Sequence, residues 1–231
     1  HLIGHWSYPV GTKKTIYVAS NGDTVELFLN GQSLGHGKIS NRYLFTFADI
    51  AFVPGELKAV ASRAGQVIAT ATEHTVGAPV ALRLTPLVGP GGVIADGADV
   101  ALFDVEAVDA KGDRVPTFQQ KVDFDFTGPG IWRGGYNSGK INSTNHTSLD
   151  LEAGINRVAV RAGRTAGKLT LTARSEGLKP ASISVESVAY AGALPTVPAA
   201  KLPSQPVRTI GATMTATTKS SGTMLLGKFI K

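Results

Sequence analysis

The chain has 231 residues, of which 42% are hydrophobic and 17% charged, with a mean hydropathy of +0.06. This composition excludes a wholly disordered chain, because disordered chains are rich in charge and poor in apolar residues. It also excludes a membrane-spanning helix, because no run of about 18 apolar residues occurs. The absence of cysteine excludes disulfide bonds, thiolate zinc sites and a cysteine nucleophile.

The net charge of +6 comes mainly from the end of the chain. Residues 1–186 hold 18 basic and 17 acidic residues, whereas residues 187–231 hold five basic residues and no acidic one. Nucleic-acid binding needs a basic face with interleaved aromatic side chains. The body is almost neutral and the bases of the tail are widely spaced, so we expect no nucleic-acid partner.

Strand signals recur through residues 1–78. Residues 15–19 are β-branched and aromatic, and residues 25–29 carry apolar side chains at alternate positions. The pair Asn30-Gly31 follows directly, and an Asn-Gly pair between alternating segments is the strongest short signal for a hairpin. Turn signals every 8–12 residues predict a small antiparallel β-sandwich over residues 1–78.

A second series of strands begins after the glycine and proline at residues 77–79. It predicts another sandwich over residues 79–189, and together the two regions predict an all-β fold of tandem immunoglobulin-like antiparallel β-sandwiches. Four prolines follow within a dozen residues, which indicates an extended linker over residues 190–209. Residues 210–231 end like a strand that is cut short, and the chain starts at His1 without Met. We therefore expect this chain to be a piece of a longer protein.

No pattern of catalytic or metal-binding residues stands out. Most acidic residues lie at polar alternate positions of predicted strands or in turns, which is typical of a solvated strand face. The five histidines show no HxH or HExxH spacing, so we expect no metal site and no cofactor. Asp109 and Asp113 flank a predicted turn, where a turn role and a calcium site are both open.

An aromatic, glycine-rich stretch near the middle of the chain offers a candidate binding site. Trp132 and Tyr136 stand among glycines next to Asn137. Sugars stack on exposed aromatic rings while nearby amides bind their hydroxyl groups, so we consider these three residues as carbohydrate contacts. The alternative is that Trp132 packs on the core of the sandwich, as a large aromatic side chain beside a strand usually does.

The residues also resemble a known family. His5-Trp6, the segment VELFLNGQSLG at residues 25–35 and PGELKAVA at residues 54–61 resemble the region that follows the catalytic barrel in bacterial glycoside hydrolase family 2 enzymes, chiefly β-galactosidases. Residues 80–189 resemble the immunoglobulin-like domain that comes next in these enzymes. The matching elements there are VDAKG at residues 108–112 and FTGPG at residues 126–130.

The resemblance implies non-catalytic accessory domains that pack on a catalytic barrel lying outside this chain. It implies a parent enzyme that hydrolyses terminal β-galactosides with retention, in the periplasm or outside a bacterial cell. The acid/base and nucleophile glutamates of the family lie in the barrel, so no catalytic residue is expected here. His5, Trp6 and Tyr8 are the candidates for docking on the barrel. β-Galactosides or galactan oligosaccharides are candidate ligands.

Two other functions remain open at this stage. The chain could be a carbohydrate-binding module that uses Trp132 and Tyr136 as its platform. It could also be an immunoglobulin-like adhesion module of a cell surface, although its first residues look more like a junction between domains than a repeat boundary.

Overall fold

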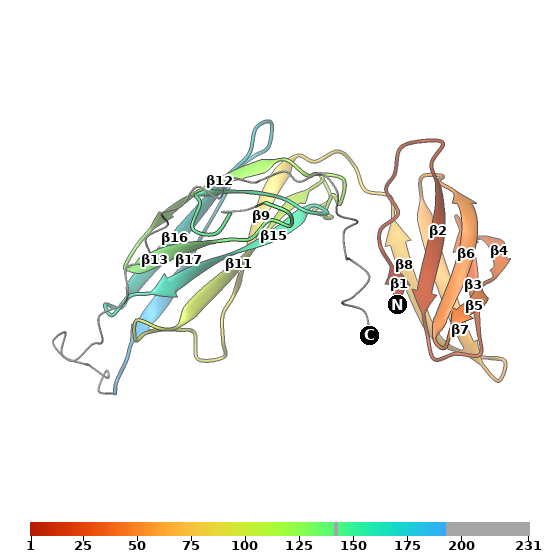
Figure 1. Cartoon of the computed structure of the whole chain (residues 1–231), viewed down its shortest axis with the longest axis horizontal. Coiled ribbons are helices and arrows are strands. Elements are labelled where there is room, and N and C mark those ends of the chain that lie inside the picture. The colour runs from red at the N-terminus through yellow and green to blue at the C-terminus, as the bar shows by residue number, and fades with distance from the viewer. Residues whose placement is uncertain (141–142, 193–231) are drawn as a thin grey trace, which may run out of the picture. The chain divides into compact units, whose positions relative to one another are not determined.

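The computed structural model describes residues 1–140 and 143–192, and every regular element among them is a β-strand (Figure 1). The prediction of an all-β fold built from antiparallel sheets is confirmed. Within the described part, no helix is long and apolar enough to cross a membrane. The predicted linker, beyond its first three residues, and the predicted terminal segment at residues 210–231 lie outside the described residues.

The first sandwich consists of two four-stranded antiparallel sheets. Their strand orders are β1-β2-β6-β5 and β4-β3-β7-β8. The strands are β1 (Leu2–Ile3), β2 (Lys13–Ala19), β3 (Thr24–Leu29), β4 (Gln32–His36), β5 (Lys38–Asn41), β6 (Leu44–Ala51), β7 (Glu56–Arg63) and β8 (Gln66–His74). Side chains from both sheets meet in one core, which includes Ile16, Val25, Phe45 and Leu57.

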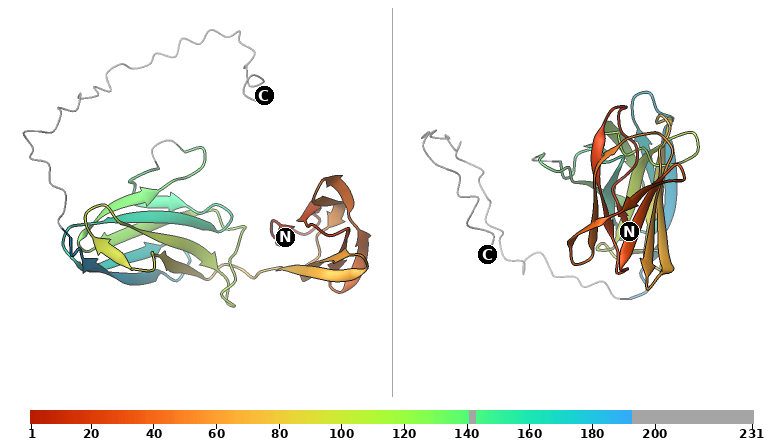
Figure 2. Two further views of the ribbon diagram at one scale, coloured as in Figure 1. Left: turned by 90° about the horizontal axis from the view of Figure 1, so that it is seen from below. Right: turned by 90° about the vertical axis from the view of Figure 1, so that its right-hand side faces the viewer.

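The second sandwich pairs a five-stranded sheet, in the order β10-β17-β16-β12-β14, with a four-stranded sheet, in the order β13-β15-β11-β9. Two further views show its strands stacked in two layers (Figure 2). The strands are β9 (Ala81–Leu87), β10 (Val93–Ala95), β11 (Val100–Val108), β12 (Lys121–Thr127), β13 (Gly130–Gly135), β14 (Ser148–Asp150), β15 (Ile155–Ala162), β16 (Gly167–Arg174) and β17 (Ala181–Ala189). Among these pairs only β10 and β17 run parallel.

Local sequence explains the tight hairpins. Asn30 and Gly31 have φ angles of 50° and 81°, and they connect β3 to β4 through the pair Leu29 and Gln32. Two consecutive positive φ angles define the type I′ turn, whose twist matches that of the flanking strands. Asparagine and glycine tolerate this conformation best, so the sequence signal and the observed turn share one physical cause.

The second sandwich has its own core, which is separate from that of the first. In β11, Ala101, Phe103 and Val105 are fully buried and alternate with residues that face outward. β15 shows the same alternation, with Val158, Val160 and Ala162 buried. Strand alternation therefore fixes which residues of the four-stranded sheet face the core and which form its outer surface.

Candidate functional site

The aromatic, glycine-rich stretch forms the edge strand β13 and the loop that follows it. A β-bulge interrupts the pairing of β13 with β15 between Trp132 and Gly134. Gly134 has a φ of 65°, and a Cβ atom at Gly135 would lie 2.3 Å from the carbonyl oxygen of Arg157. Glycine is required at both positions, at the first for the backbone angle and at the second for the close approach to β15.

Trp132 packs partly on the core of the second sandwich. Its ring centroid lies 5.5 Å from that of Phe124. Its Nε1 donates a hydrogen bond to the carbonyl oxygen of His146, at 2.9 Å. One end of the indole is therefore held by protein, and the ring is half-buried. The ring contacts the core, and because some of its surface stays exposed, carbohydrate contact remains a prediction for it.

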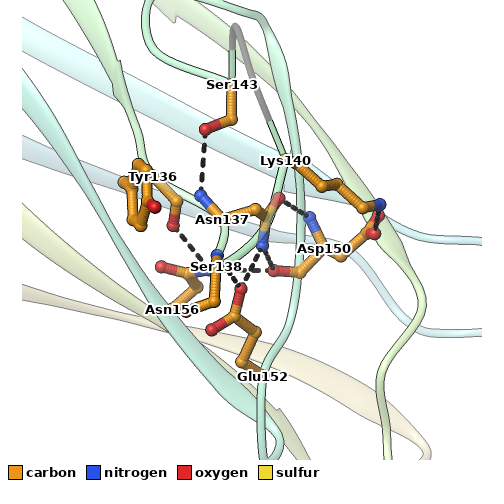
Figure 3. A network of polar contacts seen from close by, with 8 residues as sticks. All are labelled: Tyr136, Asn137, Ser138, Lys140, Ser143, Asp150, Glu152 and Asn156. Atoms are coloured by element: carbon orange, nitrogen blue, oxygen red, sulfur yellow. Dashed lines mark hydrogen bonds and ion pairs between the residues drawn. The ribbon is translucent and has the colours of Figure 1, made fainter. Parts of the chain in front are cut away.

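Asn137 is almost fully buried, with 3% of its surface exposed, and its amide is bound by protein (Figure 3). Its Nδ2 donates to the carbonyl oxygen of Asp150 at 2.8 Å and to Oε1 of Glu152 at 2.9 Å. Its Oδ1 accepts from the backbone N–H of Asp150 at 2.9 Å. Its own backbone N–H donates to Oγ of Ser143 at 3.0 Å. With all of these groups engaged, the Asn137 side chain serves to position the loop.

The carboxylate of Glu152 is the charged member of this network. It accepts hydrogen bonds from Nδ2 of Asn137 and, at 2.7 Å, from the backbone N–H of Ser138. These bonds stabilise the ionised form and lower the pKa of Glu152 below its usual value, the bond from Asn137 contributing most. Lys140 adds an ion pair to Asp150 at the rim of the loop.

Tyr136 is the exposed member of the predicted set, with 64% of its surface accessible. Its backbone carbonyl accepts a hydrogen bond from Nδ2 of Asn156 at 3.3 Å, so its main chain is anchored while its ring faces solvent. The structure thus gives the three predicted residues different environments. Carbohydrate contact stays a prediction for Tyr136 and for the free part of Trp132, and Asn137 would act only by holding them.

Asp150, Glu152 and Ser143 also belong to this site, and their sequence positions alone do not predict it. Their hydrogen bonds with Asn137 join residues that are 6 to 15 positions apart in the sequence, and two of these three bonds involve a backbone atom. The polar composition of residues 137–148 indicates a loop, but no spacing rule links an asparagine to a carboxylate in a later turn. Only the return of the chain through β14 brings these groups together.

The predicted docking residues near the start of the chain belong largely to the first sandwich itself. Trp6 is fully buried, its Nε1 donates to the carbonyl oxygen of Val53 at 3.0 Å, and its ring meets that of Phe52 edge-on at 5.2 Å. The Trp6 side chain therefore has no surface to offer a second domain. This revises the prediction for Trp6, because the sequence pattern does not show how far the chain folds over it.

His5 and Tyr8 remain partly exposed beside Trp6. Their ring centroids lie 4.4 Å apart, and Nζ of Lys14 lies 5.1 Å from the centroid of the Tyr8 ring. Partial burial, together with the positive charge of Lys14, lowers the pKa of His5, and burial raises the pKa of Tyr8. A docking role stays a prediction for these two residues.

Asp109 has a structural role in the turn that follows β11. Its Oδ1 accepts from the backbone N–H groups of Lys111 and Asp113 at 2.9 and 3.0 Å, and its Oδ2 accepts from that of Gly77 at 2.7 Å. These bonds lower the pKa of Asp109, and the bond from Gly77 contributes most. Over residues 1–140 and 143–192, no group of three or more histidine, aspartate or glutamate side chains could hold a metal ion.

The fold defines the chain as a tandem pair of antiparallel β-sandwiches, and comparison with known proteins supplies the family. Residues 91–184 match the family model of the glycoside hydrolase family 2 C-terminal domain 5, and residues 11–69 match a domain of unknown function, DUF4982. The match over residues 91–184 supports a C-terminal domain of a glycoside hydrolase family 2 enzyme, as the sequence resemblance predicted.

Individual relatives agree with this assignment. The chain is 49% identical over 189 residues to a β-glucuronidase of Formosa agariphila. The aligned region covers 81% of this chain and 19% of that protein. The chain is 31% identical over 190 residues to the β-galactosidase BoGH2A of Bacteroides ovatus, covering 81% of this chain and 22% of that protein. The chain thus spans about a fifth of the length of these relatives.

Solved structures show the same fold. A β-glucuronidase from glycoside hydrolase family 2 superimposes with a TM-score of 0.79 at 45% identity, over 86% of this chain and 22% of that one. A family 2 member from Bacteroides cellulosilyticus gives a TM-score of 0.72 at 32% identity, over 80% of this chain and 24% of that one. The names of these relatives include both β-glucuronidases and β-galactosidases, so the relatives agree on the family and differ in the substrate.

Proposed function

We propose that this chain is a non-catalytic accessory part of a family 2 glycoside hydrolase and stabilises the catalytic domain of that enzyme by packing on it. The observation that carries the proposal is the extent of the similarity. It runs through both sandwiches, yet it accounts for only 19% of the Formosa agariphila relative. We call the longer polypeptide that carries this chain the parent enzyme.

Four acidic residues of the described part have structural partners that support a non-catalytic role for them. Asp104 and Glu106 are paired with Arg157 and Arg83 on the outer face of one sheet. Asp109 and Glu152 hold turns and loops through backbone and amide hydrogen bonds. A glycosidase needs one carboxyl group that acts as an acid and a second that acts as base or nucleophile across a bound sugar. Carboxylates that are already held by arginines and turns are poorly suited to that chemistry.

For the parent enzyme we propose retaining hydrolysis of a terminal β-glycoside, with a β-glucuronide favoured over a β-galactoside. This choice follows the higher identity to the relative named a β-glucuronidase, 49% against 31% for the relative named a β-galactosidase. The sequence resemblance implied a β-galactoside, so this proposal replaces that expected substrate with a β-glucuronide.

Carbohydrate contact at the β13 loop is the second candidate function. The observation that favours it is the exposed ring of Tyr136 on a loop whose backbone is fixed by the Asn137 network. A rigid, exposed aromatic ring loses little entropy when a sugar stacks on it. This function would add to the structural role and would not replace it.

One titration tests the second candidate. β-Glucuronides, β-galactosides and galactan oligosaccharides are added to the 231-residue chain, and the heat of binding is measured for the native chain, Trp132→Ala and Tyr136→Ala. Tyr43→Ala, which removes an exposed tyrosine of the first sandwich, is the matched control. We expect no saturable change at millimolar ligand. Saturable binding that is lost in Trp132→Ala and Tyr136→Ala, but kept in Tyr43→Ala, would establish the second function.

A further inference from the structure

The outer face of the four-stranded sheet of the second sandwich is divided into two chemically different halves. In one half, Arg157 pairs with Asp104 at 2.6 Å and Arg83 pairs with Glu106 at 2.8 Å across neighbouring strands. Such exposed ion pairs are ordinary for a sheet face in water. This half needs no partner to explain it.

The other half is apolar and continuous across the sheet. Val100 on β11 and Ile131 on β13 both lie opposite Arg161 on β15, and they are 42% and 45% exposed. In the next row, Leu102 lies opposite both Ala159 and the exposed Leu87 of β9. On β11 and β15 the side chains at these positions point away from the core, because their neighbours along each strand are buried in it. Leu87 and Ile131 lie beside them on the same face and are exposed. We call this surface the apolar half-face, defined by Leu87, Val100, Leu102, Ile131, Ala159 and Arg161.

Arg161 lies in the middle of one row of this surface, and its charge has no partner there. It takes part in none of the ion pairs found within the described residues. Its Nε is buried and has no hydrogen-bond acceptor in the described part of the chain. A buried donor without an acceptor is costly, and a guanidinium flanked by apolar side chains is the arrangement that binds a carboxylate well once water is excluded.

We propose that the apolar half-face is the surface on which this chain docks to the rest of the parent enzyme, and that a carboxylate of that remaining part pairs with Arg161. The inference rests on the proposed function and names the contact it requires. An apolar surface with a central arginine is typical of protein interfaces. About four-fifths of the length of the relatives lies outside the matched region, so the polypeptide needed to cover this surface is available.

Side-chain footprinting tests the location of the contact. Hydroxyl-radical labelling of Leu87, Val100 and Ile131 is compared between the 231-residue chain and the parent enzyme. Val188, which is 51% exposed on the other sheet of the same sandwich, is the control. We expect a severalfold fall in labelling of the three residues in the parent enzyme and little change at Val188.

The outcomes separate this inference from the proposed function. Protection of other residues of the chain, with no change on the apolar half-face, would overturn the inference and leave the supporting role intact. No protection anywhere would overturn both. Protection of the apolar half-face in the isolated chain by oligosaccharides containing glucuronic acid would assign the surface to a saccharide and overturn the inference.

Charge reversal tests the role of Arg161. In the parent enzyme, Arg161→Glu should shorten the half-life of activity at elevated temperature severalfold, whereas Arg161→Lys should retain most of it. The matched control is Arg174→Glu, which reverses an exposed arginine of the opposite sheet that pairs with Asp125. In the isolated chain, Arg161→Glu should not lower the melting temperature, because the buried Nε of Arg161 has no hydrogen bond there to lose. Equal half-lives for Arg161→Glu and Arg174→Glu would overturn the pairing.

Discussion

Replacing Trp6 with alanine is expected to lower the free energy of unfolding of the first sandwich by about 3–5 kcal/mol. The indole is fully buried, meets Phe52 edge-on and donates its N–H to the carbonyl oxygen of Val53. Its removal would leave a large cavity in a small core and an acceptor without its donor. A loss of this size is a large fraction of the roughly 5–15 kcal/mol that stabilises an ordinary domain.

The chain contains two tryptophans, which allows a clean measurement of this effect. In Trp6→Ala the remaining Trp132 reports only on the second sandwich, whereas far-ultraviolet circular dichroism reports on both. Urea denaturation should then show an early loss of circular dichroism and an unchanged transition in Trp132 fluorescence. Tyr17→Ala, which removes a half-exposed side chain from β2, is the control. A change below about 1 kcal/mol for Trp6→Ala would contradict the central packing role of this residue.

Replacing Asn137 with alanine is expected to destabilise the second sandwich by about 2–4 kcal/mol. The substitution removes the amide that joins Asp150 and Glu152. It leaves the backbone N–H of Asp150 without its Oδ1 acceptor, whereas the Asp150 carbonyl oxygen keeps its hydrogen bond from Asn156. Urea denaturation followed by tryptophan fluorescence measures the loss, because Trp132 lies in the second sandwich and the Trp6 signal is common to the variant and the native chain. Tyr136→Ala in the same loop removes an exposed ring, so it should change stability little.

The Asn137→Ala variant should also change the pH dependence of stability. The pKa of Glu152 is lowered in the folded chain, so ionised Glu152 contributes stability above its unfolded pKa, and this contribution is lost as the pH falls through the folded value. Without the Asn137 amide, the pKa of Glu152 rises toward its ordinary value. The loss of stability between pH 7 and pH 3 should therefore be smaller in the variant. An equal pH dependence in both chains would show that Asn137 does not control the Glu152 carboxylate.

Local patterns were sufficient to predict strands and turns. The alternation of Val25 and Leu27 correctly placed their side chains in a core, because strand geometry converts a period of two directly into two faces. The Asn30-Gly31 pair correctly predicted a turn, because its backbone angles depend on those two residues alone. These features depend on neighbours in sequence, which a single sequence displays.

Features that depend on distant partners were not predictable in this way. The burial of Trp6 depends on Val53, 47 residues later, and that of Asn137 depends on the return of the chain at Asp150. The parallel pairing of β10 with β17 joins segments more than 80 residues apart. In each case the sequence indicates what kind of residue is present, but only the folded chain determines which group it meets.

Differential scanning calorimetry of the parent enzyme tests the supporting role most directly. If the sandwiches stabilise the catalytic domain by packing on it, their unfolding in the parent enzyme should coincide with loss of activity. It should also occur at a higher temperature than in the isolated 231-residue chain, because binding to the folded form raises stability. A transition of the sandwiches at the same temperature in both proteins, separate from the loss of activity, would contradict the proposal.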